Sequence, residues 1–319
     1  MNGQTEPLRV AVFGAGGVGG YFGARLAEAG YQVTFIARGE HLRAIRERGL
    51  RVESIRGDVH IFPAQATDDP AEVGPVDLVL VATKAWQLPE AALAMRPLVE
   101  PGTVALPLLN GVEAPEALSA ALGPEPVLGG LCKISAYKAA PGLIRHVGVE
   151  PEIVFGELDG RRTPRVERLE RVFAACRGVK VTVPPDIRAA MWAKLTFIAA
   201  FSAVGAVTRA PAGVIRRLPE TRRLLEAAMR EIVAVAQAVG VALPDEAAGQ
   251  ALAFTDRMEP HVTASMQRDI MEGRPSELEA QVGVVVRLGR QAEVLTPVNA
   301  FLYAALLPQE RRARGLETW

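Results

Sequence analysis

One lysine stands alone in a long apolar segment of this sequence. The segment MWAKLTFIAAFSAVGAVT, residues 191–208, has Lys194 as its one charged residue. Only five of the 36 basic residues are lysines, and an ammonium, unlike a guanidinium, can give up a proton when burial lowers its pKa. Such a group suits an acid that protonates a ketone oxygen during reduction by a nicotinamide cofactor. A lysine that extends its head to water from a core helix is the open alternative.

A glycine motif near the start of the chain predicts a dinucleotide site. In VAVFGAGGVGG, three glycines have G-x-G-x-x-G spacing between a predicted strand and a predicted helix. The first glycine makes a tight turn, the second admits a pyrophosphate to the backbone, and the third lets the helix pack on the strand. The alternative is a structural glycine-rich turn. The loop residues predicted to bind the cofactor are Gly14, Ala15, Gly16, Gly17, Val18 and Gly19.

The end of the second predicted strand indicates which dinucleotide is bound. An NAD site usually carries an acidic residue there for the ribose diol, whereas this chain has Ala37 and Arg38. A guanidinium suits the 2′-phosphate of NADP, so NADP(H) is the predicted cofactor. A surface arginine with no role in binding is the alternative.

Further polar residues follow the predicted strands or begin helices. Lys84 follows DLVLVAT, and Asn110 follows the next strand in LLNG, so both are expected at the carboxyl edge of the sheet, where ligands bind in open α/β folds. Downstream, Ser265 and Asp269 share a helix face, and Glu277 begins the next predicted helix. Each also has an ordinary interpretation, as a turn residue or as a first-turn acid at a helix N-terminus.

The elements that must position these residues form two predicted domains. Residues 8–13, 31–37, 77–83 and 103–109 are predicted strands that alternate with helices, which predicts a Rossmann-like doubly wound sheet in an α/β fold. Residues 127–155 predict an antiparallel hairpin appended to that sheet. The NADP-binding domain is predicted at 1–184, ending at a Pro-Pro pair, and an all-α substrate and catalytic domain at 185–319.

Composition limits the partners of the chain. Its 319 residues carry 36 basic and 36 acidic side chains, so no electrostatic footprint for nucleic acid or an anionic membrane is present, and a small molecule is the expected partner. The first residues do not predict a signal peptide, and the apolar run 195–207 is expected to be too short to cross a bilayer. A cytoplasmic location is therefore expected. The two cysteines and four histidines form no metal-ligand pattern. The apolar stretches 228–241 and 280–288 suit either a core or a homodimer face.

Several of these segments together resemble the ketopantoate reductase (2-dehydropantoate 2-reductase) family. The resemblance rests on GAGGVGG, KAWQ, LNG, MWAKL, SMQRDI, the later glutamate and LTPVNAFLY, which occur in this order along the chain. It implies an NADPH-dependent, two-domain reductase of pantothenate synthesis with its active site in the cleft. The resemblance implies that Lys194 is the general acid and that Glu277 acts beside it in the same cleft. It also implies that Ser265 binds the substrate carboxylate, that Asn110 contacts both ligands, and that Arg38, Lys84 and Ala136 contact the cofactor.

The sequence departs from the family pattern on the substrate side. The family usually carries asparagines where this chain has Ile198, Ser202 and Ala212. Ser202 is then the remaining hydroxyl on that helix face, and another 2-oxo acid becomes an alternative to ketopantoate, because a pocket with fewer hydrogen-bonding groups discriminates less against analogues. Two further alternatives are a 3-hydroxyacid dehydrogenase and a non-enzymatic NADP(H)-binding protein. KAWQ and Arg38 are evidence against the dehydrogenase.

Overall fold

The structure, a computed structural model, describes residues 8–319. It confirms the predicted fold class, a Rossmann-like parallel sheet followed by a helical part. The chain forms two compact units. The first contains residues up to Leu109 and Glu113–Ile187, and the second contains Arg188–Trp319 together with the short segment Asn110–Val112.

The central sheet of the first unit has five parallel strands. Their order is β5-β2-β1-β6-β7, and every neighbouring pair is parallel. The strands are β1 (Arg9–Phe13), β2 (Gln32–Ile36), β5 (Gln65–Thr67), β6 (Leu78–Val81) and β7 (Val104–Pro107). The helices and helical turns that accompany them are α1 (Gly17–Glu28), α2 (Gly39–Arg48), η1 (Pro70–Glu72), η2 (Ala85–Gln87), α3 (Leu88–Ala94), η3 (Arg96–Leu98) and α4 (Ala114–Leu122).

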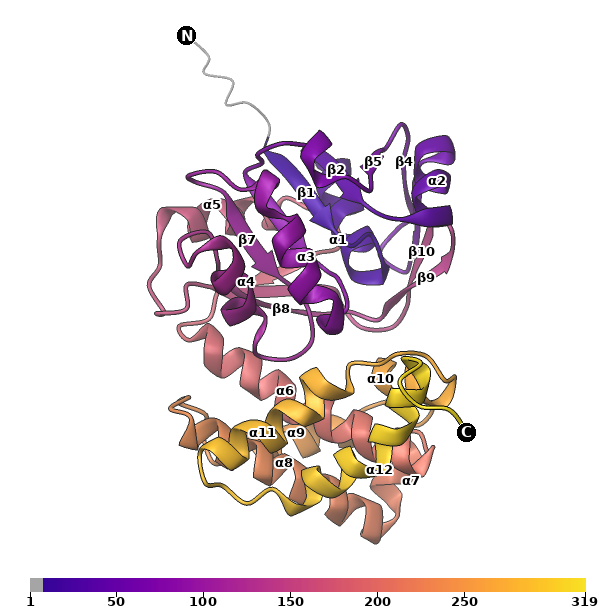
Figure 1. The fold of residues 1–319 in the computed structure, drawn as a ribbon, viewed down its shortest axis with the longest axis vertical. Helices are drawn as coiled ribbons and strands as arrows, with labels where there is room; N and C mark the ends of the chain where they lie inside the picture. The colour runs from indigo at the N-terminus through magenta and orange to yellow at the C-terminus, as the bar shows by residue number, and fades with distance from the viewer. Residues whose placement is uncertain (1–7) are drawn as a thin grey trace. The chain divides into compact units, whose positions relative to one another are not determined.

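Each face of this sheet has its own apolar core, because successive side chains of a strand point to opposite faces. On β1, Val10 and Val12 pack in a core that includes Phe22 of α1. Ala11 and Phe13 belong to a second core that includes residues of α3 and α4, the two helices that pack side by side in Figure 1. Covered faces explain why these strands are continuous apolar runs.

The predicted hairpin exists, but its placement was wrong. Strands β9 (Ala136–Ala140) and β10 (Leu143–His146) are antiparallel, yet they belong to a separate four-stranded sheet of order β4-β3-β10-β9. The partner of β10 is β3 (Leu50–Ser54), which is parallel to it and is followed by β4 (Val59–Ile61). The sequence analysis identified no strand after α2, and this is why the hairpin was assigned to the central sheet.

A third sheet of three strands and one further helix complete the first unit. Its strand order is β12-β11-β8, with β8 (Gly129–Lys133) antiparallel to β11 (Glu152–Gly156) and β12 (Lys180–Thr182) parallel to it. Helix α5 (Pro164–Ala174) packs on β11 and β12. Both cysteines of the chain are buried in this unit, as predicted for core thiols, and burial raises the pKa of the Cys176 thiol to about 12.

The second unit is helical, as predicted. Its elements are α6 (Ile187–Thr208, of which the residues from Arg188 onward belong to this unit), α7 (Ala212–Arg217), α8 (Pro219–Ala238), α9 (Ala247–Asp256), α10 (Ser265–Met271), η4 (Glu279–Gly283), α11 (Val284–Gln291) and α12 (Pro297–Ala313). Helix α8 packs against α7, α9, α11 and α12. Most of its apolar residues, like those at 282–285, are buried within the chain itself, as in a core. Val239, in the same stretch, is 39% exposed, and a homodimer stays a prediction.

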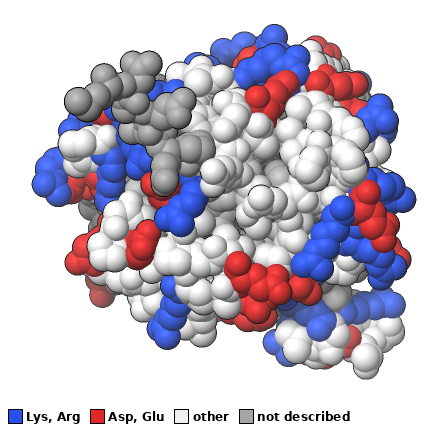
Figure 2. All heavy atoms as spheres, turned by 90° about the horizontal axis from the view of Figure 1, so that it is seen from above, with Lys and Arg blue, Asp and Glu red and all other residues white. Residues whose placement is uncertain are grey.

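Helix α6 is longer than the apolar run from which it was predicted. By length and composition alone it meets the criterion for a membrane span, so length does not exclude a span as the sequence analysis supposed. Of its most apolar window, 67% is buried inside the protein, as in a core helix. On the face of the molecule in Figure 2, basic and acidic side chains lie around an uncharged centre, in many places next to one another.

Candidate active site

The loop between β1 and α1 has the backbone that the glycine motif predicts. Gly14 has a φ of +101°, which favours glycine, and a Cβ there would lie 2.8 Å from the Ala82 carbonyl oxygen. A Cβ on Gly19 would overlap the Gly14 carbonyl oxygen, so the third glycine allows close packing of α1. At Gly16, no atom of residues 8–319 other than its chain neighbours lies within 4 Å of the position that a Cβ would take. The N-terminus of α1, with unpaired first-turn N–H groups and a positive dipole end, begins at the next residue.

These features fit a dinucleotide pyrophosphate. The protein approaches the loop tightly at its first and third glycines and leaves space at the second, which is where the motif admits a phosphate. Helix α1 carries no acidic residue in its first turn, so no carboxylate there opposes an anion.

Two other cofactor candidates of the first unit, Lys84 and Ala136, belong to segments that contact this loop. The Gly14 turn lies against Ala82 and Thr83 at the end of β6, directly before Lys84. A Cβ on Gly17 would overlap the carbonyl oxygen of Ala136, so the first residue of β9 touches the loop. The structure therefore brings the segments of Lys84 and Ala136 to the glycine loop.

Arg38 lies where β2 has ended and α2 begins. It is the N-cap residue of α2, and its side chain is 68% exposed with Nη2 3.5 Å from Glu90 Oε1. An exposed ion pair of this length contributes little to stability. The guanidinium can therefore exchange this partner for a phosphate at small cost.

In the second unit, two amides meet the carboxylate of Glu277. Asn110 Nδ2 donates to Glu277 Oε2 at 2.9 Å, and Gln281 Nε2 donates to the same oxygen at 3.4 Å. The turn at Asn110 depends on Gly111, whose φ of +102° favours glycine. A Cβ on Gly111 would lie 2.9 Å from the Ala280 carbonyl oxygen, so the glycine allows this close approach. Asn110 therefore contacts Glu277 although the two residues are far apart in the sequence. Glu277 is buried, with 5% of its surface exposed.

The backbone before Glu277 is fixed by a buried carboxylate. Glu310 of α12 is 5% exposed and accepts hydrogen bonds from the N–H and the Oγ–H of Ser276 at 3.0 and 2.5 Å. Arg314 donates to Glu310 and to the Ser276 carbonyl oxygen. Glu277 itself lies before the first regular helical turn rather than inside it, and the π-helical η4 follows. Such π-turns are frequent at functional sites.

Lys194 and Ser202 lie on α6, two helical turns apart, and α10 packs against the same helix. Lys194 is partly buried. Ser202 is fully buried, and its Oγ has no hydrogen-bond partner among the described residues. One turn beyond it, a Cβ on Gly205 would lie 2.5 Å from Oε1 of Gln267 on α10, so the glycine lets the helix that begins with Ser265 approach α6 closely.

Asp269, the other candidate of that helix, is paired with an arginine that follows the helix. Its Oδ1 accepts from Arg274 Nη2 at 2.8 Å, and its side chain is 12% exposed.

Three polar side chains next to the candidates were not predicted from the sequence. Gln281 follows Glu277 by one helical turn, a spacing that the sequence displays. Gln267 lies within SMQRDI. Thr83, whose buried Oγ1 lacks a hydrogen-bond partner within residues 8–319, precedes Lys84.

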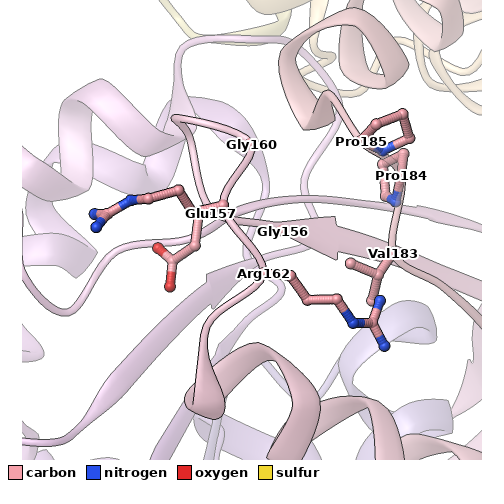
Figure 3. Close-up of a pocket in the computed structure, with 8 residues that line it drawn as sticks. Gly156, Glu157, Gly160, Arg162, Val183, Pro184 and Pro185 are labelled. Carbon is pink, nitrogen blue, oxygen red and sulfur yellow. The ribbon is translucent and has the colours of Figure 1, made fainter.

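A cavity of about 230 Å³ lies elsewhere in the first unit. Figure 3 shows the loop that contains Glu157, Gly160 and Arg162 on one side of it and the segment Val183–Pro185 on the other. None of the candidate residues lines this cavity. Within residues 8–319, no three His, Cys, Asp or Glu side chains are grouped so that they could hold a metal ion.

Fold and loop together define a Rossmann-type dinucleotide-binding protein with a helical second unit. Comparison with known proteins gives the family. The family model "Ketopantoate reductase PanE/ApbA" matches residues 10–160, and its C-terminal counterpart matches residues 186–310. The chain belongs to the ketopantoate reductase family, which comprises NADP-dependent oxidoreductases that act on CH–OH groups.

Similar proteins cover nearly the whole chain. An "Uncharacterized oxidoreductase YkpB" of Bacillus subtilis is 32% identical over 94% of this chain and 98% of its own length. A 2-dehydropantoate 2-reductase of Mesorhizobium japonicum is 32% identical over 91% of this chain and 94% of its own length. The crystal structure of a PanE/ApbA family ketopantoate reductase from Ralstonia eutropha is 34% identical, with a TM-score of 0.88 over 96% of this chain and 100% of that one.

Proposed function

We propose that this protein reduces a small 2-oxo acid with NADPH, with 2-dehydropantoate (ketopantoate) as the first candidate substrate. The observation that carries the proposal is the combination of an open glycine loop with a buried carboxylate held by two amides, in a chain of the ketopantoate reductase family. When bound, NADPH supplies the hydride that adds to the carbonyl carbon of the substrate.

The first unit holds the cofactor in this proposal. The loop Gly14–Gly19 and the N-terminus of α1 bind the pyrophosphate. Arg38 binds the 2′-phosphate and gives up its exposed pair with Glu90 to do so. Lys84 and Ala136, whose segments touch the loop, line the remainder of the cofactor site.

Residues of the second unit act on the substrate carbonyl. Lys194 hydrogen-bonds the carbonyl oxygen and donates a proton to it as negative charge develops. Glu277 is the second catalytic residue, and Asn110 holds it through the 2.9 Å hydrogen bond while also contacting both ligands. Because Ser276 is tied to Glu310 and Arg314, the Glu277 backbone is held in one position before any ligand arrives.

Ser202 and Ser265 are the proposed substrate contacts. A buried hydroxyl without a partner costs free energy, on the order of 1–3 kcal/mol, and the Ser202 Oγ is such a group. A substrate oxygen that accepts its hydrogen removes that cost. Ser202→Ala should therefore leave the free energy of unfolding unchanged or raise it, while it raises the KM of the oxo acid.

Substrate identity is the part of the proposal that most needs a direct test. Ile198 and Ala212 offer no hydrogen-bonding side chain where the family usually has asparagines, and this favours a second candidate, a different 2-oxo acid with fewer polar groups. NADPH oxidation with ketopantoate and with unbranched and bulkier 2-oxo acids separates the two. Turnover of ketopantoate with the highest kcat/KM supports the first candidate, and turnover of another oxo acid alone supports the second.

A non-enzymatic NADP(H)-binding protein is the remaining alternative. It predicts NADPH binding with no oxidation of the cofactor in the presence of any 2-oxo acid of the panel. That result would overturn the proposed reaction.

A further inference from the structure

A buried histidine touches the glycine loop directly. His41 lies in the first turn of α2 and is 7% exposed. One ring nitrogen, Nε2, is 2.7 Å from the carbonyl oxygen of Ala15. The other, Nδ1, accepts a hydrogen bond of 2.9 Å from the N–H of Gly142, in the turn between β9 and β10. The ring therefore connects the glycine loop to the second sheet.

These two contacts fix the tautomer of the ring. A backbone N–H can only donate, so Nδ1 is an acceptor and carries no proton. Nε2 then carries the hydrogen and donates it to the Ala15 oxygen. The histidine is neutral in this arrangement, and burial, as the largest cause, lowers its pKa below the ordinary value of 6.5, with the Lys138 charge acting in the same direction and the Ala15 hydrogen bond against it.

The Ala15 carbonyl is part of the peptide that carries the Gly16 N–H. In a planar trans peptide the C=O and the N–H point in opposite directions. Holding the Ala15 oxygen therefore sets the direction of the Gly16 N–H. Gly16 is also the loop residue at which the described part of the chain leaves space for a ligand. The Gly16 N–H precedes α1 and is one of the donors that its helix N-terminus offers to an anion.

We propose that His41 is a positioning residue for the cofactor: its Nε2–H holds the Ala15–Gly16 peptide so that the Gly16 N–H meets the pyrophosphate. The loop is supported a second time from the same hairpin, where the Ala136 carbonyl lies against Gly17. A loop held in its binding conformation before the ligand arrives loses less conformational freedom on binding. The proposal rests on NADPH as the cofactor, which the wild-type protein tests separately in the same experiment.

Three substitutions separate the two ring contacts. The amide nitrogen of Gln lies as many bonds from Cα as histidine Nε2, so His41→Gln keeps a donor for Ala15. The amide oxygen of Asn lies as many bonds from Cα as Nδ1, so His41→Asn keeps only the acceptor for Gly142. His41→Leu removes both. The matched control is His60→Gln, because exposed His60 also bonds a backbone carbonyl, that of Arg48 at the other end of α2.

The measurement is the Kd of NADPH, titrated by its fluorescence, with thermal unfolding of each variant without ligand. We expect His41→Gln and His60→Gln to bind within about threefold of the wild type. His41→Asn and His41→Leu should bind about tenfold more weakly, the loss of about one hydrogen bond, and kcat at saturating NADPH should not change. Equal Kd values for the Gln and Asn variants, or wild-type affinity in the Leu variant, would overturn the proposal.

A measurement on the unmodified protein covers the case in which the variants do not fold. Long-range ¹H–¹⁵N NMR of the wild type reports which ring nitrogen of His41 is protonated. Protonation of Nε2 supports the assigned contact, and protonation of Nδ1 contradicts it whatever the protein binds. A wild type that binds no NADPH refutes the cofactor assignment, and the tautomer still decides the contact of His41 with the loop.

Discussion

The second glycine of the loop offers a sharp test, because the structure predicts opposite effects of one methyl group on folding and on binding. Gly16→Ala adds a Cβ where, among the described residues, no atom beyond its chain neighbours lies within 4 Å. The backbone φ there is −74°, which alanine adopts freely. Loss of glycine entropy in the unfolded chain stabilises by about 0.4–1 kcal/mol. Alanine is the poorer N-cap by a similar amount, roughly 0.5–1 kcal/mol, so the free energy of unfolding should change by less than about 1 kcal/mol.

Cofactor affinity should respond much more strongly. The same methyl occupies the space through which the pyrophosphate approaches the backbone. Loss of one hydrogen bond to a charged group costs about 1.5–3 kcal/mol, which is roughly a 10- to 100-fold increase in the Kd of NADPH. Fluorescence titration of NADPH measures the Kd, and thermal or denaturant unfolding of the protein without ligand measures stability.

Gly17→Ala is the matched control one residue further on. Its Cβ would lie 2.6 Å from the Ala136 carbonyl carbon and 2.9 Å from the Tyr137 Cα, so the backbone must move. We expect this variant to lose about 1–3 kcal/mol of stability, as overpacked sites do, as well as affinity. Wild-type NADPH affinity in Gly16→Ala would refute the reasoning, because the pyrophosphate would then not lie at this loop.

Two further predictions concern charge. Arg38→Ala should raise the Kd of NADPH about tenfold or more and leave the Kd of NADH unchanged. The control is Arg43→Ala, at an exposed arginine near the start of α2, which should change neither Kd. Equal losses of affinity for both cofactors would contradict a contact of Arg38 with the 2′-phosphate. Burial, the largest cause for each, lowers the pKa values of His41 and His146 below 6.5, so the folded protein binds fewer protons than the unfolded chain below that pH. The contribution of each histidine to stability should be fully present above pH 6.5 and should fall below it, by at most about 1.4 kcal/mol per pH unit. Denaturant unfolding across this range measures the slope, and a flat profile down to pH 5 would contradict it.

The sequence predicted the parts of the fold that long apolar patterns determine. The buried strands β1, β2, β6 and β7 and the long helices α6 and α8 carry continuous or periodic apolar residues, so their type and order could be derived. Strands β3, β4 and β5 are partly exposed and contain polar residues, so they lack the continuous apolar run that predicted β6 and β7. Because β3 was missed, the hairpin β9–β10 was assigned to the wrong sheet.

At the candidate site, residue types were predictable and contacts were not. The glycine spacing identified the loop, and the isolated lysine made Lys194 a candidate, which stays a prediction. The pairing of Asn110 with Glu277 depends on a left-handed turn at Gly111, and no local pattern reveals where that turn leads. The contact of His41 is with the backbone atoms of Ala15 and Gly142, which leave no trace in side-chain identity.

The most direct test of the account is the kcat of Lys194→Ala with the best 2-oxo acid, measured beside the Kd of NADPH for the same variant. General acid catalysis by this lysine predicts that kcat falls by about 10²- to 10⁴-fold, while the Kd of NADPH stays within about twofold of the wild-type value. A variant that keeps kcat within tenfold of the wild type would contradict Lys194 as the proton donor, and with it the central claim of the proposed mechanism.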